Sequence, residues 1–399
     1  MTTTSMHLLS AILLLFSFVC ILNARVHPVP IKEDPETHMN VIQILSYWKY
    51  PGQEHHVITK DGYNLTIHRI PHGRNNSIAT KGVVYLQHCL LCSSADFLLN
   101  LPSESLGFML ADQGYDVWMG NIRGNFYSRS HVTLKPSDPD FWKFSFDEHS
   151  LIDLPAMIDY VLNNTGKLQL KYIAHSQGTL MGFLGFSSNK ELASKIKIFA
   201  AMAPVLYVGH IKGLVKFIAE NYYDLDFLSW LLGLHELLPS GKLTHTTAEL
   251  FCGKIDAFIC EDVIFAICGP DQTGFNKSRL VVYVSHTPAG TSVQNMLHWG
   301  QAALRNNVTH FDYGKKENMK KYNLPYPPAY DPFNIQIPIA LYHGKYDWLV
   351  QPKDYQQLSK LPNIVYQKEL ETFEHLDFIW SIHAAKLVYS DIIELFEKY

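Results

Sequence analysis

Hydrophobic and polar positions follow two alternating patterns between residues 82 and 204. Short apolar runs of strand length are each followed by a stretch whose apolar residues recur every three or four positions. The first pattern predicts buried strands and the second predicts amphipathic helices. The predicted strands cover 82–88, 116–121, 170–176 and 197–204, and the predicted helices cover 106–115, 153–166 and 177–188. Strands that alternate with helices predict a mainly parallel sheet covered on both faces.

The helix predicted over 153–166 has recognisable ends. Asp153 precedes its first turn as a candidate N-cap, Pro155 occupies that turn, and Gly166 follows the last periodic residue. These residue types are typical of a helix start and a helix end.

The pattern changes after residue 204. Residues 205–330 are mostly helical and irregular in pattern, and strand-like runs return at 334–344 and 363–370 before a final helix at 384–399. One sheet interrupted by a helical insertion explains this better than two independent domains. We expect a core formed by 25–204 and 331–399, with 205–330 as a cap or lid over a site.

The amino terminus predicts secretion. Leu8 to Leu22 is an apolar run that is short for a membrane span, and Ala24 is a plausible last residue before cleavage. Residues 1–24 therefore resemble a signal peptide. No Lys or Arg precedes the apolar run, which leaves an uncleaved anchor as the alternative. No later stretch is apolar and long enough to span a bilayer.

Glycosylation signals and cysteines agree with an oxidising, extracytoplasmic compartment. Cys252 and Cys260 could close a short loop there. The chain has six cysteines, of which Cys20 lies in the signal segment, so an odd number remains afterwards. The N-x-[ST] sequons are Asn64, Asn75, Asn163, Asn276 and Asn307.

Composition excludes several function classes. The formal net charge is −4, and no Lys/Arg run is long enough for a nucleic-acid surface. No phosphate-binding loop, dinucleotide fingerprint or metal-ligand cluster is present in the sequence. We therefore expect no metal and no cofactor.

Ser176 is the candidate nucleophile. It lies in "KYIAHSQGTL", between a predicted strand and a predicted helix, and the frame from Ala174 to Gly178 matches G-x-S-x-G except that alanine replaces the first glycine. Such a turn exposes a serine Oγ at the sheet edge, and it needs small flanking residues because strand and helix cross closely. The alternative is a buried turn that happens to contain serine. His175 is a poor base because adjacent side chains on the turn point apart.

A nucleophilic serine needs a base, and the base needs a carboxylate that orients it. In this arrangement the acid precedes the histidine along the chain. Asp347 follows the next predicted strand and His375 follows the last one, both in loops, which makes them the candidate acid and base. Glu374 and Asp377 are too near His375 in sequence to reach its far ring nitrogen. We expect these two carboxylates to be solvated or to support the site indirectly.

Long blocks of the sequence are more specific than this five-residue frame. They include "LGFMLADQGYDVWMGNIRGN", "FSFDEHSLIDLPAMIDYV", "HSQGT", "HTPAGTSVQNMLHW" and "YPPAYD", and they run from "DPETHMNVIQILSYWKYPGQEHHVITKDGYNLTIHRIPHG" to "EHLDFIW". In these blocks the chain resembles the acid lipase family, which includes lysosomal and gastric lipases. The resemblance implies the α/β-hydrolase fold, with a helical cap inserted before the last strands. It also implies Ser176 as nucleophile, Asp347 as orienting acid and His375 as base.

The resemblance further implies the oxyanion hole and a disulfide. Gln177, which follows the nucleophile, supplies one backbone N–H. The second donor comes from a loop that reads H-G-L-L in the family and "HCLL" here, which implies Leu90. The bonded cysteine pair of the family corresponds to Cys252 and Cys260, and its free cysteine corresponds to Cys268.

Cys89 and Ala174 depart from the family pattern at backbone-critical positions. If the family's glycine uses a positive φ, a cysteine in its place is strained and misplaces the Leu90 N–H. On that basis Cys89→Gly is expected to raise kcat, whereas Ala174→Gly is expected to affect mainly stability. Cys89 and Cys92 also form a C-x-x-C spacing. We favour two reduced thiols, with a disulfide that stiffens the loop or a redox motif as alternatives.

The resemblance implies neutral lipid esters, triacylglycerols or sterol esters, as substrates at a lipid–water interface. Leu225 to Leu238 is rich in leucine and aromatic residues, which fits either packing on the core or contact with lipid. Our first hypothesis is a secreted or lysosomal monomeric serine lipase. The second is a lipase-like protein that binds lipid with weak or lost catalysis.

Overall fold

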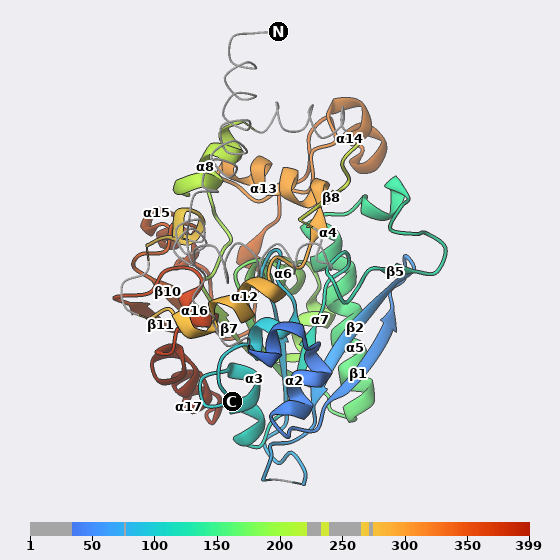
Figure 1. Cartoon of the computed structure of the whole chain (residues 1–399). Coiled ribbons are helices and arrows are strands. Elements are labelled where there is room, and N and C mark those ends of the chain that lie inside the picture. Colours follow the sequence, from blue (N-terminus) through green and yellow to red (C-terminus); the bar gives the residue numbers. More distant parts are fainter. Residues whose placement is uncertain (1–33, 76, 222–232, 239–264, 271–273) are drawn as a thin grey trace, which may run out of the picture.

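A nine-stranded sheet forms the centre of the computed structural model, which describes residues 34–75, 77–221, 233–238, 265–270 and 274–399 (Figure 1). The six strands from β4 to β11 along the sheet are parallel, and β1, β2 and β5 are antiparallel. The mainly parallel sheet predicted from the sequence is thus confirmed. Along the sheet the strands are β1 (Gln53–Ile58), β2 (Tyr63–Ile70), β4 (Asp116–Gly120), β3 (Val83–Gln87), β6 (Leu170–His175), β7 (Ile196–Met202), β10 (Ile339–Gly344) and β11 (Ile364–Leu370), with β5 (Ser130–His131) beside β2.

Helices cover both faces of the sheet because successive strand residues point to opposite sides. In β3, Val84 and Leu86 pack in one hydrophobic cluster and Tyr85 packs in the other. The first cluster includes side chains of α2 (Val41–Tyr47), α3 (Leu106–Asp112) and α17 (Ser390–Phe396), and the second includes side chains of α5 (Leu154–Thr165) and α6 (Gln177–Ser188). Burial on two sides explains why the central strands read as continuous apolar runs.

The helix predicted to begin at Asp153 begins earlier. A π-helical stretch, His149–Asp153, joins α4 (Phe146–Glu148) to α5 without a break, so Asp153 is inside the helix and its side chain makes no cap. Its buried carboxylate instead accepts hydrogen bonds from Arg123 Nε at 2.8 Å and from the Arg123 backbone N–H at 3.0 Å. Gly166 ends α5 in the left-handed region, as predicted, with a φ of 65°.

The order of the strands reverses its direction at β3. The chain passes from β3 to its neighbour β4 and then returns to β6 on the other side of β3. Loops that leave β3 and β6 therefore run in opposite directions at the carboxyl ends of these strands, which is where open α/β sheets commonly bind their ligands. Ser176 and the "HCLL" loop both lie at this point.

The regular elements between β7 and β10 in the described part are mainly helices, and those at 213–220, 293–305 and 315–322 lie above the sheet in Figure 1. They are α8 (Gly213–Glu220), β8 (Glu236–Leu237), η6 (Lys277–Arg279), α12 (Leu280–His286), β9 (Thr291–Ser292), α13 (Val293–Arg305) and α14 (Lys315–Tyr322). Residues 222–232 and 239–264 lie outside the described part, and so do Cys252, Cys260 and the signal segment 1–24. The division into core, 205–330 and 331–399 stays a prediction.

Short helices complete the described chain. None of the helices in the described part, short or long, is long and apolar enough to cross a membrane. The short helices are η1 (Pro35–His38), η2 (Ser94–Phe97), η3 (Pro139–Trp142), α7 (Lys190–Ser194), η7 (Pro332–Asn334), α15 (Pro352–Leu358), α16 (Asp377–Trp380) and the π-helical η8 (Ala385–Tyr389).

Candidate active site

Ser176 occupies a strained turn between β6 and α6. Its φ of 52° and ψ of −121° lie outside the regions that non-glycine residues favour, which costs about 1–3 kcal/mol. Its N–H donates to the Met202 carbonyl at 3.1 Å, so the turn is tied to the neighbouring strand β7. The strain turns the Ser176 side chain out of the sheet, and α6 begins at the next residue.

The two small residues around Ser176 have different reasons to be small. A Cβ atom at Gly178 would lie 2.5 Å from the Gln87 carbonyl oxygen and 2.9 Å from that of His88, because α6 crosses the end of β3. Only glycine fits this position. Ala174 is fully buried within β6, opposite Gln87 of β3 and Ala201 of β7, and its φ is not positive. The methyl group of Ala174 therefore packs in the core.

We expect Ala174→Gly to lower the free energy of unfolding by about 1 kcal/mol and to leave kcat unchanged. Glycine in a strand loses more conformational entropy on folding and removes a packed methyl group. Thermal unfolding and hydrolysis of a soluble short-chain ester, which avoids interfacial adsorption, measure the two effects. A change in kcat without a change in stability would contradict a packing role for Ala174.

Three sequence-predicted residues meet at the carboxyl edge of the sheet. Ser176 Oγ lies 2.7 Å from His375 Nε2, and Asp347 Oδ2 lies 2.7 Å from His375 Nδ1. A carboxylate can only accept here, so Nδ1 carries the proton and Nε2 accepts from the serine hydroxyl. All three side chains are buried. The geometry is that of a nucleophile, a general base and an orienting acid.

Asp347 is held by the turn that follows β10. Its Oδ1 accepts hydrogen bonds from the N–H groups of Leu349 at 2.8 Å and Val350 at 3.0 Å. Gln351 Nε2 donates to the Asp347 carbonyl at 2.7 Å. The two N–H donors fix the carboxylate and leave Oδ2 directed at His375, and the Gln351 bond fixes the backbone of the turn.

The other titratable residues near His375 are buried in contacts with the loop that carries this histidine. His175 Nε2 donates to the His375 carbonyl at 2.8 Å, so His175 faces the backbone of the histidine loop. Burial, and then the neighbouring His375, hold the pKa of His175 well below its usual value. Glu374 and Asp377 are buried, and Asp377 Oδ2 accepts from the Glu374 N–H at 2.8 Å. Of the two alternatives expected for these carboxylates, solvation is wrong because the loop folds inward around them, and indirect support of the site stays a prediction.

The loop after β3 presents Leu90 at the same edge. The Cys89 carbonyl accepts hydrogen bonds from His88 Nδ1 at 2.8 Å and from the Cys92 N–H at 3.3 Å. Because a trans peptide is planar, the Leu90 N–H points away from that carbonyl. Among the described residues, none accepts a hydrogen bond from this N–H. This N–H is therefore left available to a ligand, and its role as the second oxyanion donor stays a prediction.

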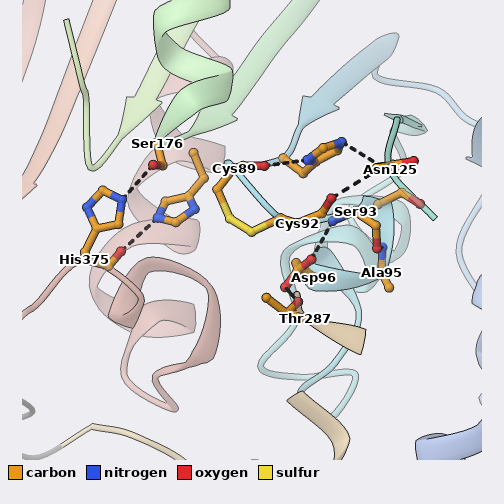
Figure 2. The surroundings of a disulfide bond; sticks show 12 residues. Cys89, Cys92, Ser93, Ala95, Asp96, Asn125, Ser176, Thr287 and His375 are labelled. Carbon is orange, nitrogen blue, oxygen red and sulfur yellow. Dashed lines mark hydrogen bonds between the residues drawn. A yellow bond between two sulfur atoms is a disulfide. The ribbon is translucent and has the colours of Figure 1, made fainter. Parts of the chain in front are cut away.

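Two expectations about Cys89 need correction. The φ of Cys89 is not positive, and the left-handed residue of the loop is Leu91, with a φ of 61°, which costs about 1–2 kcal/mol for a non-glycine residue. Cys89 and Cys92 are joined by a disulfide, so the preferred pair of reduced thiols is wrong (Figure 2). The sequence shows the spacing of two cysteines but not the turn that brings them together. The reason to expect a higher kcat from Cys89→Gly is therefore removed.

A polar network from α13 holds the side chain of Gln177. Its Oε1 accepts hydrogen bonds from Asn295 Nδ2 at 2.9 Å and from Trp299 Nε1 at 2.7 Å. The residue next to the nucleophile is thus anchored to the segment inserted between β7 and β10. Sequence reasoning missed His88, Leu91, Asn295 and Trp299 as supporting residues. Asn295 and Trp299 lie within the family-like block "HTPAGTSVQNMLHW", which is the available signal for them.

The sequons differ in exposure. Asn75, Asn163 and Asn307 are exposed, whereas Asn64, inside β2, and Asn276 are half-buried. Use of any sequon stays a prediction. Within the described residues, no cluster of three His, Cys, Asp or Glu side chains could hold a metal ion.

Comparison with known proteins gives matches over nearly the whole chain. The family described as "alpha/beta hydrolase fold" matches residues 82–382, and a "partial alpha/beta-hydrolase lipase region" matches residues 41–101. Gastric triacylglycerol lipase of Bos taurus is 45% identical over 92% of this chain and 93% of its own length. Lysosomal acid lipase/cholesteryl ester hydrolase of Rattus norvegicus is 44% identical over 92% and 93%. Lipase lipl-1 of Caenorhabditis elegans is 45% identical over 91% and 92%.

Solved structures show the fold alone. A putative lipase from Sulfolobus solfataricus has a TM-score of 0.55 at 13% identity, over 84% of this chain and 90% of that structure. Epoxide hydrolase VrEH1 from Vigna radiata has a TM-score of 0.51 at 13% identity, over 88% and 99%. The sequence relatives, the sheet order and the turn at Ser176 lead to one conclusion: the chain belongs to the acid lipase family of the α/β-hydrolase fold.

Proposed function

We propose that this protein is a serine lipase that hydrolyses neutral lipid esters, triacylglycerols or sterol esters, through an acyl-enzyme. The observation that carries the proposal is the buried hydrogen-bond series from Ser176 through His375 to Asp347. The substrate class rests on relatives named triacylglycerol lipase and cholesteryl ester hydrolase.

In the acylation step, His375 Nε2 takes the proton of Ser176 as Oγ attacks the ester carbonyl carbon. Asp347 stabilises the imidazolium that forms and keeps the ring in place. The N–H groups of Leu90 and Gln177 donate to the negative oxygen of the tetrahedral intermediate. The imidazolium then gives its proton to the leaving alcohol, and the acyl group stays on Ser176.

In the deacylation step, water replaces the alcohol. His375 removes a proton from the water, whose oxygen attacks the acyl carbon, and Ser176 leaves with that proton. The products are a free fatty acid and the regenerated enzyme. No step requires a metal or a redox group.

A lipid binder without catalysis is the weaker hypothesis. It depended on backbone damage at Cys89 and Ala174, but neither residue has a positive φ. Both side chains are buried in the hydrophobic core. The argument for lost catalysis therefore has no backbone distortion to rest on.

We further propose a secreted or lysosomal monomer that acts at a lipid–water interface, with residues 205–330 as a cap over the site. The network from α13 to Gln177 supports a cap that is coupled to the active site. The disulfide agrees with an oxidising compartment.

A hydrolysis panel tests the substrate class. Purified protein is assayed from pH 4 to 8 against emulsified triacylglycerols, sterol esters and phospholipids, and a fluorophosphonate probe reports an activated serine. We expect labelling and hydrolysis of a neutral ester. Labelling with hydrolysis of phospholipids alone would overturn the substrate class, and no labelling at any pH would overturn the enzyme.

A further inference from the structure

We propose that the Cys89–Cys92 disulfide is a positioning element of the oxyanion hole: it closes the turn that aims the Leu90 N–H. The inference rests on the proposed function, because it concerns the same reaction. Neither cysteine would contact the substrate, so both act through the backbone of Leu90.

The four residues from Cys89 to Cys92 form one tight turn. The Cys92 N–H donates to the Cys89 carbonyl at 3.3 Å, and the two Cα atoms are 5.1 Å apart. Leu91, the third residue, has a φ of 61°, and Leu90, the second, does not lie in the positive region. This combination is a type II turn, in which glycine or asparagine is preferred at the third position. Leu91 is thus an unfavourable residue for the turn, and the disulfide joins the two ends of that same turn.

One end of the turn is anchored to the rest of the fold. The Leu91 carbonyl accepts from the Ala289 N–H at 2.6 Å, and the Cys92 carbonyl accepts from Asn125 Nδ2 at 3.4 Å. The next residue, Ser93, donates its N–H to Asp96 Oδ2 at 2.8 Å. In Figure 2 the disulfide lies between this anchored side and the Ser176–His375 pair. The disulfide therefore links Cys89 covalently to this anchored side of the turn.

The other end of the turn is the peptide that carries the donor. The Cys89 carbonyl and the Leu90 N–H belong to one planar unit, so any rotation of the carbonyl redirects the N–H. His88 holds that carbonyl through Nδ1 at 2.8 Å, and His88 Nε2 lies 3.3 Å from the Ile122 N–H, which donates to it. Burial lowers the pKa of His88 to about 4, so the ring is neutral at pH values well above 4. Without the disulfide, the described contacts that hold this turn would be His88 on the Cys89 carbonyl, the long Cys92–Cys89 backbone bond and the Ala289 N–H on the Leu91 carbonyl.

The test compares kcat and KM on a soluble short-chain ester. The double variant Cys89→Ala/Cys92→Ala removes the bond without placing a polar group in a buried site. We expect kcat to fall on the order of 10-fold with KM little changed, because a misaligned donor acts on the transition state. Adding Leu91→Gly should restore most of kcat, because glycine adopts the left-handed conformation without the covalent bond.

Lys49→Gly is the matched control. Lys49 is exposed and has a φ of 64°, so the substitution relieves the same backbone strain away from the site. It should leave kcat unchanged in both the wild type and the double alanine variant. Thermal unfolding confirms that each variant is folded, and fluorophosphonate labelling of the wild type tests the proposed function separately.

Reduction of the wild type gives an independent measurement. Dithiothreitol passes two electrons and two protons to the disulfide, which yields two thiols and cyclic oxidised dithiothreitol. Alkylation followed by peptide mass spectrometry measures the fraction of protein molecules in which both Cys89 and Cys92 are reduced. The kcat of that fraction should fall as in the double variant. Wild-type kcat in the folded double variant or in the reduced enzyme would overturn the proposal. A loss that Leu91→Gly does not restore would also overturn it.

Discussion

Replacement of Ser176 by alanine is expected to lower kcat for ester hydrolysis by a factor on the order of 10⁴ to 10⁶. The hydroxyl is the attacking group, and the remaining His375 and oxyanion donors would stabilise only slow attack by water. His375→Ala should lose activity to a similar extent, because Ser176 then has no base 2.7 Å from its Oγ. Since the pair acts as one unit, the double variant should be no slower than either single variant.

A serine on the same helix provides the control for this result. Ser187 is buried in α6 and its Oγ donates to the Leu184 carbonyl at 3.2 Å, away from the triad. Ser187→Ala should keep wild-type kcat and fluorophosphonate labelling, whereas Ser176→Ala should lose both. Wild-type activity in a folded Ser176→Ala protein would show that another residue is the nucleophile.

Replacement of Asp347 by asparagine should lower kcat by a factor on the order of 10⁴, less than the loss of Ser176. The N–H groups of Leu349 and Val350 would hold the amide oxygen of the new side chain, as they now hold Asp347 Oδ1. The amide nitrogen would then donate to His375 Nδ1, which forces the ring proton onto Nε2. In this tautomer the ring cannot accept a proton from Ser176.

A second aspartate–histidine pair in the same protein provides the control. Asp354 is buried, and its Oδ1 lies 2.7 Å from His210 Nδ1. This pair does not contact Ser176. Asp354→Asn should lower thermal stability and leave kcat on a soluble ester unchanged. If both asparagine variants lose kcat equally, the loss comes from disturbed folding and Asp347 has no special role in orienting His375.

The order of the elements and the candidate triad follow from the sequence by itself. Apolar runs and helical periodicity locate the strands from 82 to 204 and from 334 to 370, because burial on both faces leaves a local pattern in each strand. Ser176, Asp347 and His375 each follow such a strand. Parallel strands end at one edge of their sheet, so the sequence assigns residues that are far apart in the chain to one site.

The partners of individual side chains were decided only by the tertiary structure. Asp153 has the residue type of a helix cap, yet a π-helical stretch extends the helix before it and Arg123 binds its carboxylate. Glu374 and Asp377 have the residue types of a solvated loop, yet that loop folds inward. Local preferences are worth about 1 kcal/mol, and a buried charged contact outweighs them.

The "HCLL" loop shows the same limit within the active site. The sequence indicates a cysteine in place of a glycine, but the strain falls on Leu91, two residues later, and the cysteine is bonded to Cys92. Similarly, Gln177 is held by Asn295 and Trp299, which lie more than a hundred residues away in the chain. A turn type depends on backbone angles, and a hydrogen-bond network depends on which elements pack together. Neither property leaves a periodic pattern in the sequence, so only the folded chain determines them.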